Sequence, residues 1–231
     1  MITSALLERR REAAVASGGT SAPAIYRAAL DLVLDVGLKG ELLEFGAGTG
    51  TLVRQLLDAG FDGRITAVDI LPRPAGLAAA VRWIQADLHE PLAVAGESFD
   101  AIVSTEVIEH LENPRAVFRE FGRLLRPGGT LIVTTPNQES LRSLTTLALR
   151  GHFVDFLDGS YPAHITALVR RDFQRLCQEA GFEPPRFSYT NHGGVPRLPR
   201  LRWQTVSAGL LRGRLFSDNV LMLARKPREA R

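Results

Sequence analysis

The sequence predicts an α/β fold in which a mostly parallel sheet carries helices on both faces. Three observations predict it. Short apolar runs alternate along the chain with segments whose apolar residues recur at helical spacing. Turns rich in glycine or proline separate the two kinds of segment. Strands that alternate with helices form parallel sheets, and right-handed crossovers bring their carboxyl ends to one edge, where ligands bind.

The composition indicates one globular domain over residues 1–231. Its 45% apolar and 23% charged residues are ordinary values for a globular protein. Cys177 is the only cysteine, so no internal disulfide can form, and no spacing predicts a zinc site. The basic run Arg9–Arg11 precedes no apolar stretch, which argues against a signal peptide, and no apolar run reaches the roughly 18 residues of a membrane span. We therefore expect a cytoplasmic protein.

The first part of the chain predicts an N-terminal helical cap followed by the first strands. Apolar residues at helical spacing predict a helix from Ala22 to Val36 with Ser21 as its cap, so we place the helical cap at residues 1–37. Another amphipathic helix is expected around Leu52–Leu57. Four apolar runs are predicted strands: Glu41–Phe45, Arg64–Ile70, Val81–Ala86 and Phe99–Ser104.

The rest of the chain continues the alternation. Asn113 and Pro114 begin a predicted helix, which Pro127-Gly128-Gly129 is expected to end, and a further helix is predicted over Arg171–Ala180. Two insertions, at residues 138–170 and 191–217, interrupt the pattern. The predicted strands of this part are Thr130–Thr135, Arg186–Thr190 and Asn219–Ala224.

A strand that runs into three alternate glycines and then into a helix is the most informative motif. Gly46, Gly48 and Gly50 permit positive φ and let a ligand approach the backbone, although a tight turn without a ligand has the same pattern. A dinucleotide fingerprint needs a sixth-position glycine, and that position is Thr51. Glu44 at the strand end would repel a pyrophosphate and attract a ligand that carries an ammonium and a sulfonium. The motif therefore favours S-adenosylmethionine over NAD.

Acidic residues also end the next two predicted strands. Asp69 can accept hydrogen bonds from two ribose hydroxyls, and Asp87 can accept one from an adenine amino group. Ile70 and Leu88 follow these acids and can sandwich the base. Either aspartate alone would be explained as a helix or turn cap. Together with Glu44 they place acids at three successive strand ends, which predicts a binding edge.

These motifs resemble the class I S-adenosylmethionine-dependent methyltransferases, in particular the subgroup with ubiquinone-pathway O-methyltransferases. The resemblance rests on Glu44–Gly50, Asp69, Asp87, Phe99–Pro114 and Leu125–Asn137, and it covers roughly residues 38–181. It implies a Rossmann-like, doubly wound sheet of seven strands with one antiparallel strand, for which Asn219–Ala224 is the candidate. It also implies that the loop after the fourth strand covers the cofactor. The expected cofactor-binding residues are Glu44, Gly46, Ala47, Gly48, Asp69, Ile70, Asp87, Leu88, Thr105 and Glu106.

The segment Glu106-Val-Ile-Glu109-His110 is the candidate for catalysis. On a helical turn its three polar side chains share one face, and His110 can take a proton from an acceptor hydroxyl near neutral pH, so we assign Glu109 and His110 as catalytic. The alternative is a structural role, with the acids at a helix N-terminus. Some relatives with this pattern use a metal and others have none known, so His164 is kept as a further potential ligand and no metal is assigned.

The two insertions give weaker signals. In the resembling family the 138–170 segment covers the acceptor pocket, and Phe153, Phe156 and Tyr161 can line it or only fill core. Arg197–Phe216, interpreted as one helix, is amphipathic and basic. That composition suits an anionic membrane surface or an anionic acceptor, and the alternative is a solvated face over a core-packing helix.

The sequence thus predicts a methyltransferase that acts on a small-molecule acceptor, by in-line methyl transfer to oxygen. An RNA-modifying enzyme and a non-catalytic cofactor-binding protein are the alternatives. No platform of interleaved aromatic and basic residues is found, which argues against nucleic acid as a partner. The sequence predicts neither the acceptor nor the oligomeric state.

Overall fold

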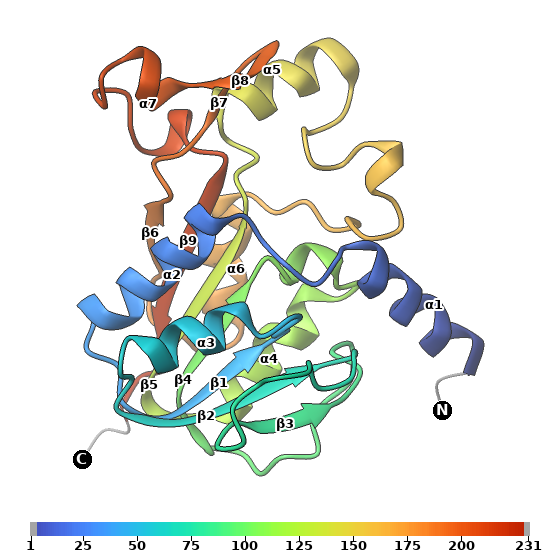
Figure 1. Cartoon of the computed structure of the whole chain (residues 1–231), viewed down its shortest axis with the longest axis vertical. Helices are drawn as coiled ribbons and strands as arrows, with labels where there is room; N and C mark the ends of the chain where they lie inside the picture. The colour runs from blue at the N-terminus through green and yellow to red at the C-terminus, as the bar shows by residue number, and fades with distance from the viewer. Residues whose placement is uncertain (1–3, 229–231) are drawn as a thin grey trace.

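The computed structural model describes residues 4–228, except for the side chain of Pro199. A seven-stranded sheet forms its centre, with helices on both faces (Figure 1). The strands of this sheet are β1 (Gly40–Phe45), β2 (Gly63–Asp69), β3 (Arg82–Gln85), β4 (Phe99–Thr105), β5 (Leu125–Pro136), β6 (Arg186–Tyr189) and β9 (Asn219–Arg225). The longer helices are α1 (Ser4–Ala16), α2 (Pro23–Asp35), α3 (Thr51–Asp58), α4 (Pro114–Leu124), α5 (Leu141–Arg150) and α6 (Arg170–Glu179).

The strand order is β3-β2-β1-β4-β5-β9-β6, which confirms the predicted sheet of seven strands. Strands β1 to β5 pair in parallel, whereas β9 runs antiparallel to β5 and β6. The order reverses between β1 and β4, and ligands bind at such a switch point. Because β9 is antiparallel, its first residue, Asn219, pairs with Pro136 at the end of β5. The beginning of β9 therefore reaches the edge formed by the carboxyl ends of the parallel strands.

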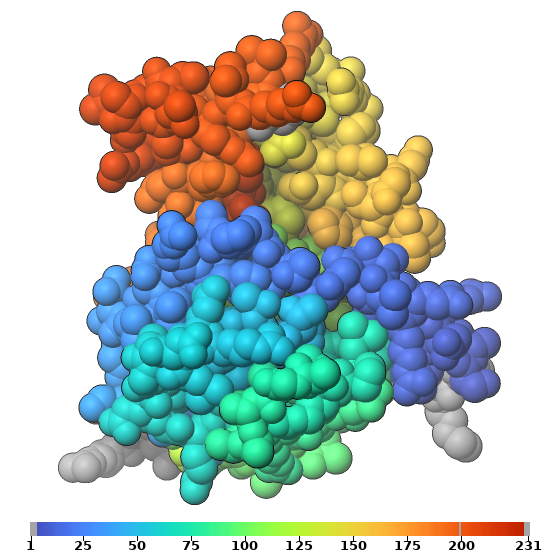
Figure 2. All heavy atoms as spheres, viewed as in Figure 1, coloured from blue at the N-terminus to red at the C-terminus, as the bar shows by residue number. Residues whose placement is uncertain are grey.

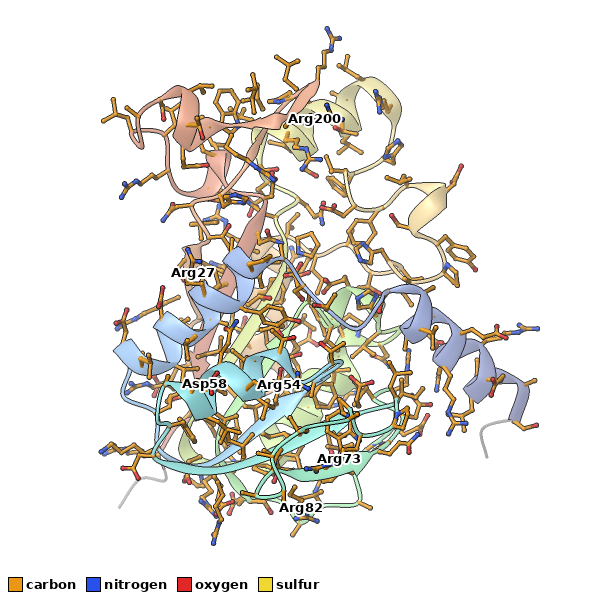
Figure 3. The ribbon with its side chains drawn as sticks, viewed as in Figure 1. Arg27, Arg54, Asp58, Arg73, Arg82 and Arg200 are labelled. Carbon is orange, nitrogen blue, oxygen red and sulfur yellow. The ribbon has the colours of Figure 1, made fainter. Side chains whose placement is uncertain are left out.

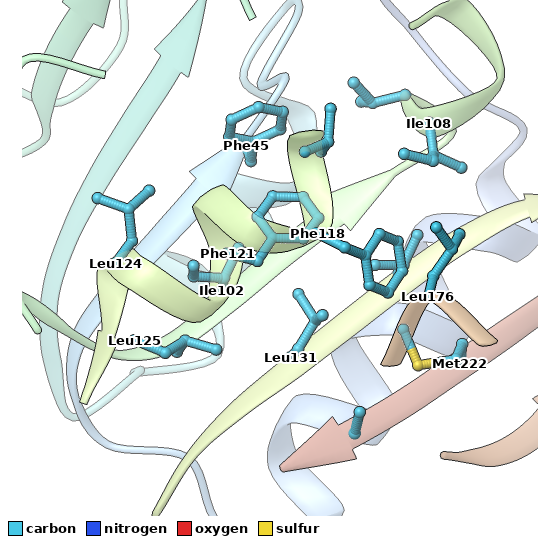
Figure 4. Packing of buried hydrophobic residues seen from close by; sticks show 14 of the residues in the cluster. Phe45, Ile102, Ile108, Phe118, Phe121, Leu124, Leu125, Leu131, Leu176 and Met222 are labelled. Atoms are coloured by element: carbon cyan, nitrogen blue, oxygen red, sulfur yellow. The ribbon is translucent and has the colours of Figure 1, made fainter. Parts of the chain in front are cut away.

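Two apolar clusters hold the helices on the sheet. Figure 4 shows the larger one, in which the aromatic stripe of α4 packs against β1, β4 and β5. The rings of Phe45 and Phe121 meet edge to face, with centroids 5.0 Å apart. The second cluster packs α2 and α3 against the opposite face. As predicted, α4 begins at Asn113, whose side chain accepts a hydrogen bond from the Ala116 amide at 3.1 Å.

Two local predictions were wrong. Ser21 does not cap α2: Ala22 occupies the cap position without a side-chain bond, and the Ser21 amide instead donates to the Tyr26 hydroxyl at 2.8 Å. Pro127-Gly128-Gly129 does not end α4 either, because the helix stops at Leu124 and the three residues lie in β5. They form an irregular start to that strand, where its register with β4 shifts.

The predicted basic helix over Arg197–Phe216 was also wrong. The segment forms β8 (Leu198–Arg202), which pairs with β7 (Gly194–Val195), then the single turn α7 (Trp203–Val206) and the 3-10 turn η3 (Arg214–Phe216). Gly209 and Gly213 have φ of 82° and 81°, values that a right-handed helix cannot include. The prediction of membrane contact therefore loses the amphipathic helix on which it depended.

Segments 138–170 and 191–217 lie next to each other at one end of the molecule, where α5 contacts β7 and η3 (Figure 1). The connection between α1 and α2 crosses the sheet below them (Figure 1). Within residues 4–228, no helix combines the length and the apolar character that a membrane span requires.

Candidate active site

A cavity of about 700 Å³ opens at the carboxyl edge of the parallel strands. Figure 2 shows the surface hollowed between the N-terminal segment and the segments drawn above it. The volume is in the usual range for small-molecule sites. Two predicted residues, Glu44 and Ala47, are not part of the wall. The others line it: Gly46, Gly48, Asp69, Ile70, Asp87, Leu88, Thr105, Glu106, Glu109 and His110.

The glycine loop is held close to two neighbouring segments. The amides of Gly46 and Ala47 both donate to the Val68 carbonyl, at 2.9 and 3.0 Å, and the Gly48 amide donates to Asp69 Oδ2 at 2.7 Å. Gly48 has φ of 49°, and a Cβ atom there would lie 2.1 Å from the Gly19 carbonyl oxygen. Glycine is therefore required at position 48, both for its φ and for the approach of the α1–α2 connection.

Glu44 lies behind the loop with 1% of its surface exposed. Its Oε2 atom is buried and has no hydrogen-bond partner among the described residues. Burial, followed by the charge of Asp69, raises the pKa of Glu44 well above its ordinary value. A buried carboxyl group without a full set of partners destabilises the protein unless a cation compensates it. Burial therefore favours the neutral carboxyl of Glu44, and a positive charge near the loop would act in the opposite direction.

Asp69 and Asp87 are both in the wall, but their carboxylates are differently engaged. Asp69 accepts from the amides of Gly48 and Leu71, and burial raises its pKa. Asp87 Oδ1 accepts from the His89 amide and ring, while Oδ2 accepts from Arg10 at 2.7 Å. A role of Asp87 in adenine recognition stays a prediction. A bound adenine would share the Asp87 carboxylate with Arg10.

Arg10 of α1 is a wall residue that the sequence did not reveal. Its guanidinium bridges Asp87 and Glu112, the latter through Nη2 at 3.0 Å and Nε at 3.3 Å. No residue of α1 is buried, so these charge-assisted bonds are a main contact of the helix with the domain. The run of three arginines was the only sequence signal, and it does not identify partners 77 and 102 residues away.

Glu106 follows β4 in an unusual backbone conformation, with φ of 54°. Its carboxylate accepts from the Thr134 hydroxyl at 2.9 Å and from the Asn219 amide at 3.0 Å. Burial raises the pKa of Glu106 to about 8. A non-glycine residue at positive φ costs about 1–3 kcal/mol and often marks a functional site. The strain turns the chain so that the next residues enter the wall.

Glu109, His110 and His164 form one cluster, in which one ligand atom from each lies within 4.8 Å of the others. Glu109 is fully buried; its Oε2 accepts from the Thr135 hydroxyl at 3.1 Å, and its Oε1 has no partner among the described residues. Burial, and then the charge of Glu106, raises the pKa of Glu109 well above its usual range. The structure thus brings together three of the four potential ligands. The fourth, Glu106, was predicted to share a helical face with Glu109 and His110, but it precedes the 3-10 turn Ile108–His110 and is not in this cluster.

Both histidines of the cluster have their ring orientation set by backbone carbonyls. His110 Nδ1 lies 2.7 Å from the Ala163 oxygen, and His164 Nδ1 lies 2.6 Å from the Asp155 oxygen. A carbonyl only accepts, so each Nδ1 carries a hydrogen, and in the neutral tautomer that this geometry selects the lone pair is on Nε2. Burial lowers the pKa of His110, which keeps this ring neutral at neutral pH. Two such nitrogens and a buried carboxylate oxygen are donors that fit a divalent metal ion.

The far end of the cavity comes from the two insertions. Tyr161 and Pro162 line this end, and Tyr161 has 73% of its surface exposed. Phe153 and Phe156 are not in the wall. The Phe156 ring instead packs against His164, with centroids 5.4 Å apart. Of the two alternatives that the sequence left open, the two phenylalanines therefore follow the packing role and not the pocket-lining role. Polar wall residues that the sequence did not reveal are Arg142, His192 and Asp218, whereas Arg202 comes from the basic segment Arg197–Phe216, whose composition suits an anionic acceptor.

Arginines outside the cavity come from separate elements. Figure 3 labels Arg27 on α2, Arg54 on α3, Arg73 between β2 and β3, Arg82 on β3 and Arg200 on β8. Arg82 and Arg200 lie at opposite ends of the molecule. These labelled side chains do not follow one helix or one groove, as a track for a nucleic-acid backbone would require.

Comparisons with known proteins agree with this geometry. The profile of a family described as a methyltransferase domain matches residues 20–184. The chain is 35% identical over 114 residues to malonyl-[acyl-carrier protein] O-methyltransferase of Hahella chejuensis, which covers 47% of this chain and 40% of that protein. It is 30% identical over 166 residues to ubiquinone biosynthesis O-methyltransferase of Xanthomonas oryzae pv. oryzae, which covers 63% of this chain and 67% of that protein.

A solved structure shares the fold at lower identity. It is the 1,6-didemethyltoxoflavin-N1-methyltransferase of Burkholderia thailandensis, with bound 1,6-didemethyltoxoflavin and S-adenosylhomocysteine. The TM-score is 0.58 at 19% identity, over 89% of this chain and 79% of that chain. With the family match over most of the chain, these findings show that the protein belongs to the methyltransferase-domain family and is a class I S-adenosylmethionine-dependent methyltransferase.

Proposed function

We propose that this enzyme methylates a hydroxyl oxygen of a small-molecule acceptor and that His110 takes the proton of that hydroxyl. The observation that carries the proposal is the neutral His110 ring, whose Nδ1 is held by the Ala163 carbonyl and whose Nε2 lone pair is left for a proton. It lies in the same cavity as the glycine loop. The names of the Hahella and Xanthomonas relatives, both O-methyltransferases, support transfer to oxygen.

The chain's residues would divide the work along the cavity. S-adenosylmethionine, when bound, supplies a methyl group on a sulfonium that departs as a neutral thioether. Asp69 would accept hydrogen bonds from the ribose, and Ile70 and Leu88 would enclose the base. The positive charge of the bound cofactor would lower the raised pKa values of Glu44 and Glu106, and the ionised acids would then balance that charge. The main contribution of the wall is to hold the acceptor oxygen in line at about 3–3.5 Å. His110 then removes the hydroxyl proton as the bond to oxygen forms.

A methyl-transfer screen tests the proposal. Purified protein is incubated with methyl-labelled cofactor and separate pools of phenols, quinol precursors, sugars, carboxylic acids and RNA. Label is expected in a small-molecule pool. Label that resists hydrolysis excludes a methyl ester, and the carbon-13 NMR shift of the labelled methyl group distinguishes an O-methyl ether from an N-methyl or C-methyl product. Label confined to RNA would support the RNA-modifying alternative instead. An absence of turnover in every pool, with S-adenosylhomocysteine still bound, would favour the non-catalytic alternative.

Glu109, His110 and His164 support a second candidate, a metal-assisted form of the same transfer. A divalent ion held by these three side chains would polarise the acceptor hydroxyl and lower its pKa. In excess chelator, activity should then disappear and return when Mg²⁺ or Zn²⁺ is restored in excess over chelator. Unchanged turnover in chelator would remove the metal and leave proton transfer to His110 alone.

The pKa of Glu106 leads to a prediction about stability. Unfolded glutamate releases its proton near pH 4.5, whereas folded Glu106 keeps its proton up to about pH 8. Between these values the unfolded state binds fewer protons, so the wild type loses stability as the pH rises. Glu106→Gln does not titrate. Its amide oxygen can keep the bond from Thr134, and its amide group can bond to Asn219 once the Asn219 amide turns over to present its oxygen. The difference in free energy of unfolding, variant minus wild type, should therefore be about 2–4 kcal/mol larger at pH 8 than at pH 5.

Denaturant unfolding of the cofactor-free protein at pH 5, 6.5 and 8 measures this difference. Glu183→Gln, at an exposed position after α6, is the matched control and should show no comparable trend. A difference between Glu106→Gln and wild type that does not change with pH would contradict the buried, protonated state of Glu106.

A further inference from the structure

Opposite the glycine loop, the cavity wall holds a pair of arginines that the proposed chemistry does not use. Arg142 lies in the first turn of α5, and Arg202 is the last residue of β8. Both side chains line the cavity, as do Asp218 and Asn219 just before and at the start of β9. These elements adjoin β5 and β9, whereas the predicted cofactor residues follow β1 to β4. The pair therefore belongs to the side of the cavity where an acceptor enters.

One carboxylate oxygen serves both guanidinium groups. Arg142 Nη1 lies 3.0 Å from Asp218 Oδ2, and Arg202 Nη1 lies 3.4 Å from the same atom. This oxygen also accepts from the Gly194 amide at 3.0 Å. A guanidinium has five N–H groups, and each arginine uses one of them in a hydrogen bond to a described residue, so most donors are free for a ligand.

Two acids face the arginine pair. Asp218 contacts both guanidinium groups through one oxygen. Asp155 faces Arg142, and its burial raises its pKa. His192 adds no acid: its pKa is lowered by burial and by Arg202. Glu139 lies nearby but pairs with Arg170 and Arg214 instead.

We infer that Arg142 and Arg202 bind an anionic group of the acceptor, a carboxylate or a phosphate, while its hydroxyl faces His110. The planar guanidinium matches both anions with paired hydrogen bonds, and the partly enclosed wall strengthens them. The inference rests on the proposed function, because it names the acceptor class of the same cavity. Neutral acceptors of equal size would lose these bonds and leave the free N–H donors of both arginines unused.

Binding of simple probes tests this inference without a known acceptor. Saturation-transfer NMR is used to titrate benzoate, phenyl phosphate and benzyl alcohol against protein saturated with S-adenosylhomocysteine. At least one anion should bind about 10-fold to 100-fold more tightly than benzyl alcohol, the range expected for hydrogen bonds to a charged group. Preference for benzoate identifies a carboxylate, preference for phenyl phosphate identifies a phosphate, and equal affinity for all three probes overturns the inference.

Variants separate the arginine pair from other sources of anion binding. Arg142→Gln and Arg202→Gln should each remove most of the preference, and Arg142→Lys should restore part of it because the charge remains without the paired donors. Arg150→Gln, at the exposed end of the same helix, should behave as wild type. Thermal unfolding of each variant shows that the protein is folded. An anion preference that survives both glutamine variants overturns the inference.

The affinity for S-adenosylhomocysteine distinguishes this inference from the proposed function. It should stay within about twofold of wild type in Arg142→Gln, because the arginine lies on the acceptor side. A loss equal to the loss of anion affinity would mean that the pair holds the carboxylate of the cofactor, and the inference would fall. If the wild type bound the anions but not S-adenosylhomocysteine, the proposed function would be wrong and the anion-binding site would still be supported.

Discussion

Gly48→Ala should lower the affinity for S-adenosylhomocysteine at least 100-fold and destabilise the protein by about 2–4 kcal/mol. Two effects combine at this position. The φ of 49° disfavours any residue with a side chain, and the added Cβ would lie 2.1 Å from the Gly19 carbonyl oxygen. Relief of this clash must move either the glycine loop or the α1–α2 connection, and both line the cavity. The hydrogen bond from the Gly48 amide to Asp69 would be lost with the movement.

Gly60→Ala is the matched control for this prediction. Gly60 follows α3 with φ of 72°, and a Cβ atom there meets no atom within 4 Å. Gly60→Ala should lower the free energy of unfolding only by the backbone strain, about 1 kcal/mol, and leave the affinity for S-adenosylhomocysteine unchanged. Isothermal titration with S-adenosylhomocysteine and denaturant unfolding measure the two effects. If both variants behaved alike, the close approach of residues 19 and 48 would not be what shapes the site.

His110→Ala should reduce kcat about 10²-fold to 10⁴-fold with the acceptor that the screen identifies. The variant removes the Nε2 lone pair that accepts the hydroxyl proton, but it leaves the glycine loop and Asp69 intact. The affinity for S-adenosylhomocysteine should therefore stay within about threefold of wild type. Because the pKa of His110 is lowered, the wild-type rate should fall only below about pH 6.5, where the ring becomes protonated. This acidic limb should disappear in the variant.

Single-turnover rates between pH 5 and pH 9 check this prediction. His152→Ala is the control, since this histidine lies outside the cavity wall and bonds to the Phe153 carbonyl. A kcat within threefold of wild type in His110→Ala would show that positioning alone suffices and that no proton acceptor is needed at this place.

The sequence predicted most of the sheet because its strands and helices have strong periodic patterns. Short apolar runs such as Glu41–Phe45 and Phe99–Ser104 match observed strands to within one residue. The strand Asn219–Ala224 was predicted from its residues, but its antiparallel direction came from the resemblance to a family, since pairing direction leaves no periodic signal. The basic segment misled because its charges and apolar residues also suit a helix, while Gly209 and Gly213 break it.

The candidate site was predictable where its residues sit next to strand ends in the sequence. Asp69 and the turn from Glu106 to His110 belong to this class. Residues from the N-terminal helix and the insertions were missed, because their partners are distant in the chain: Arg10 meets Asp87 77 residues away, and Arg142 meets Asp218 76 residues away. A surface arginine has no local pattern that names such a partner, so only the folded chain reveals the pair.

The central claim is that acids at the strand ends bind a cationic adenosyl donor and reject a diphosphate. Isothermal titration of S-adenosylmethionine, S-adenosylhomocysteine and NADH into wild type and Asp69→Asn tests it most directly. We expect both adenosyl ligands to bind wild type, about 10-fold to 100-fold weaker binding in Asp69→Asn, and no heat from NADH. Tight binding of NADH, with no heat from either adenosyl ligand, would contradict the account.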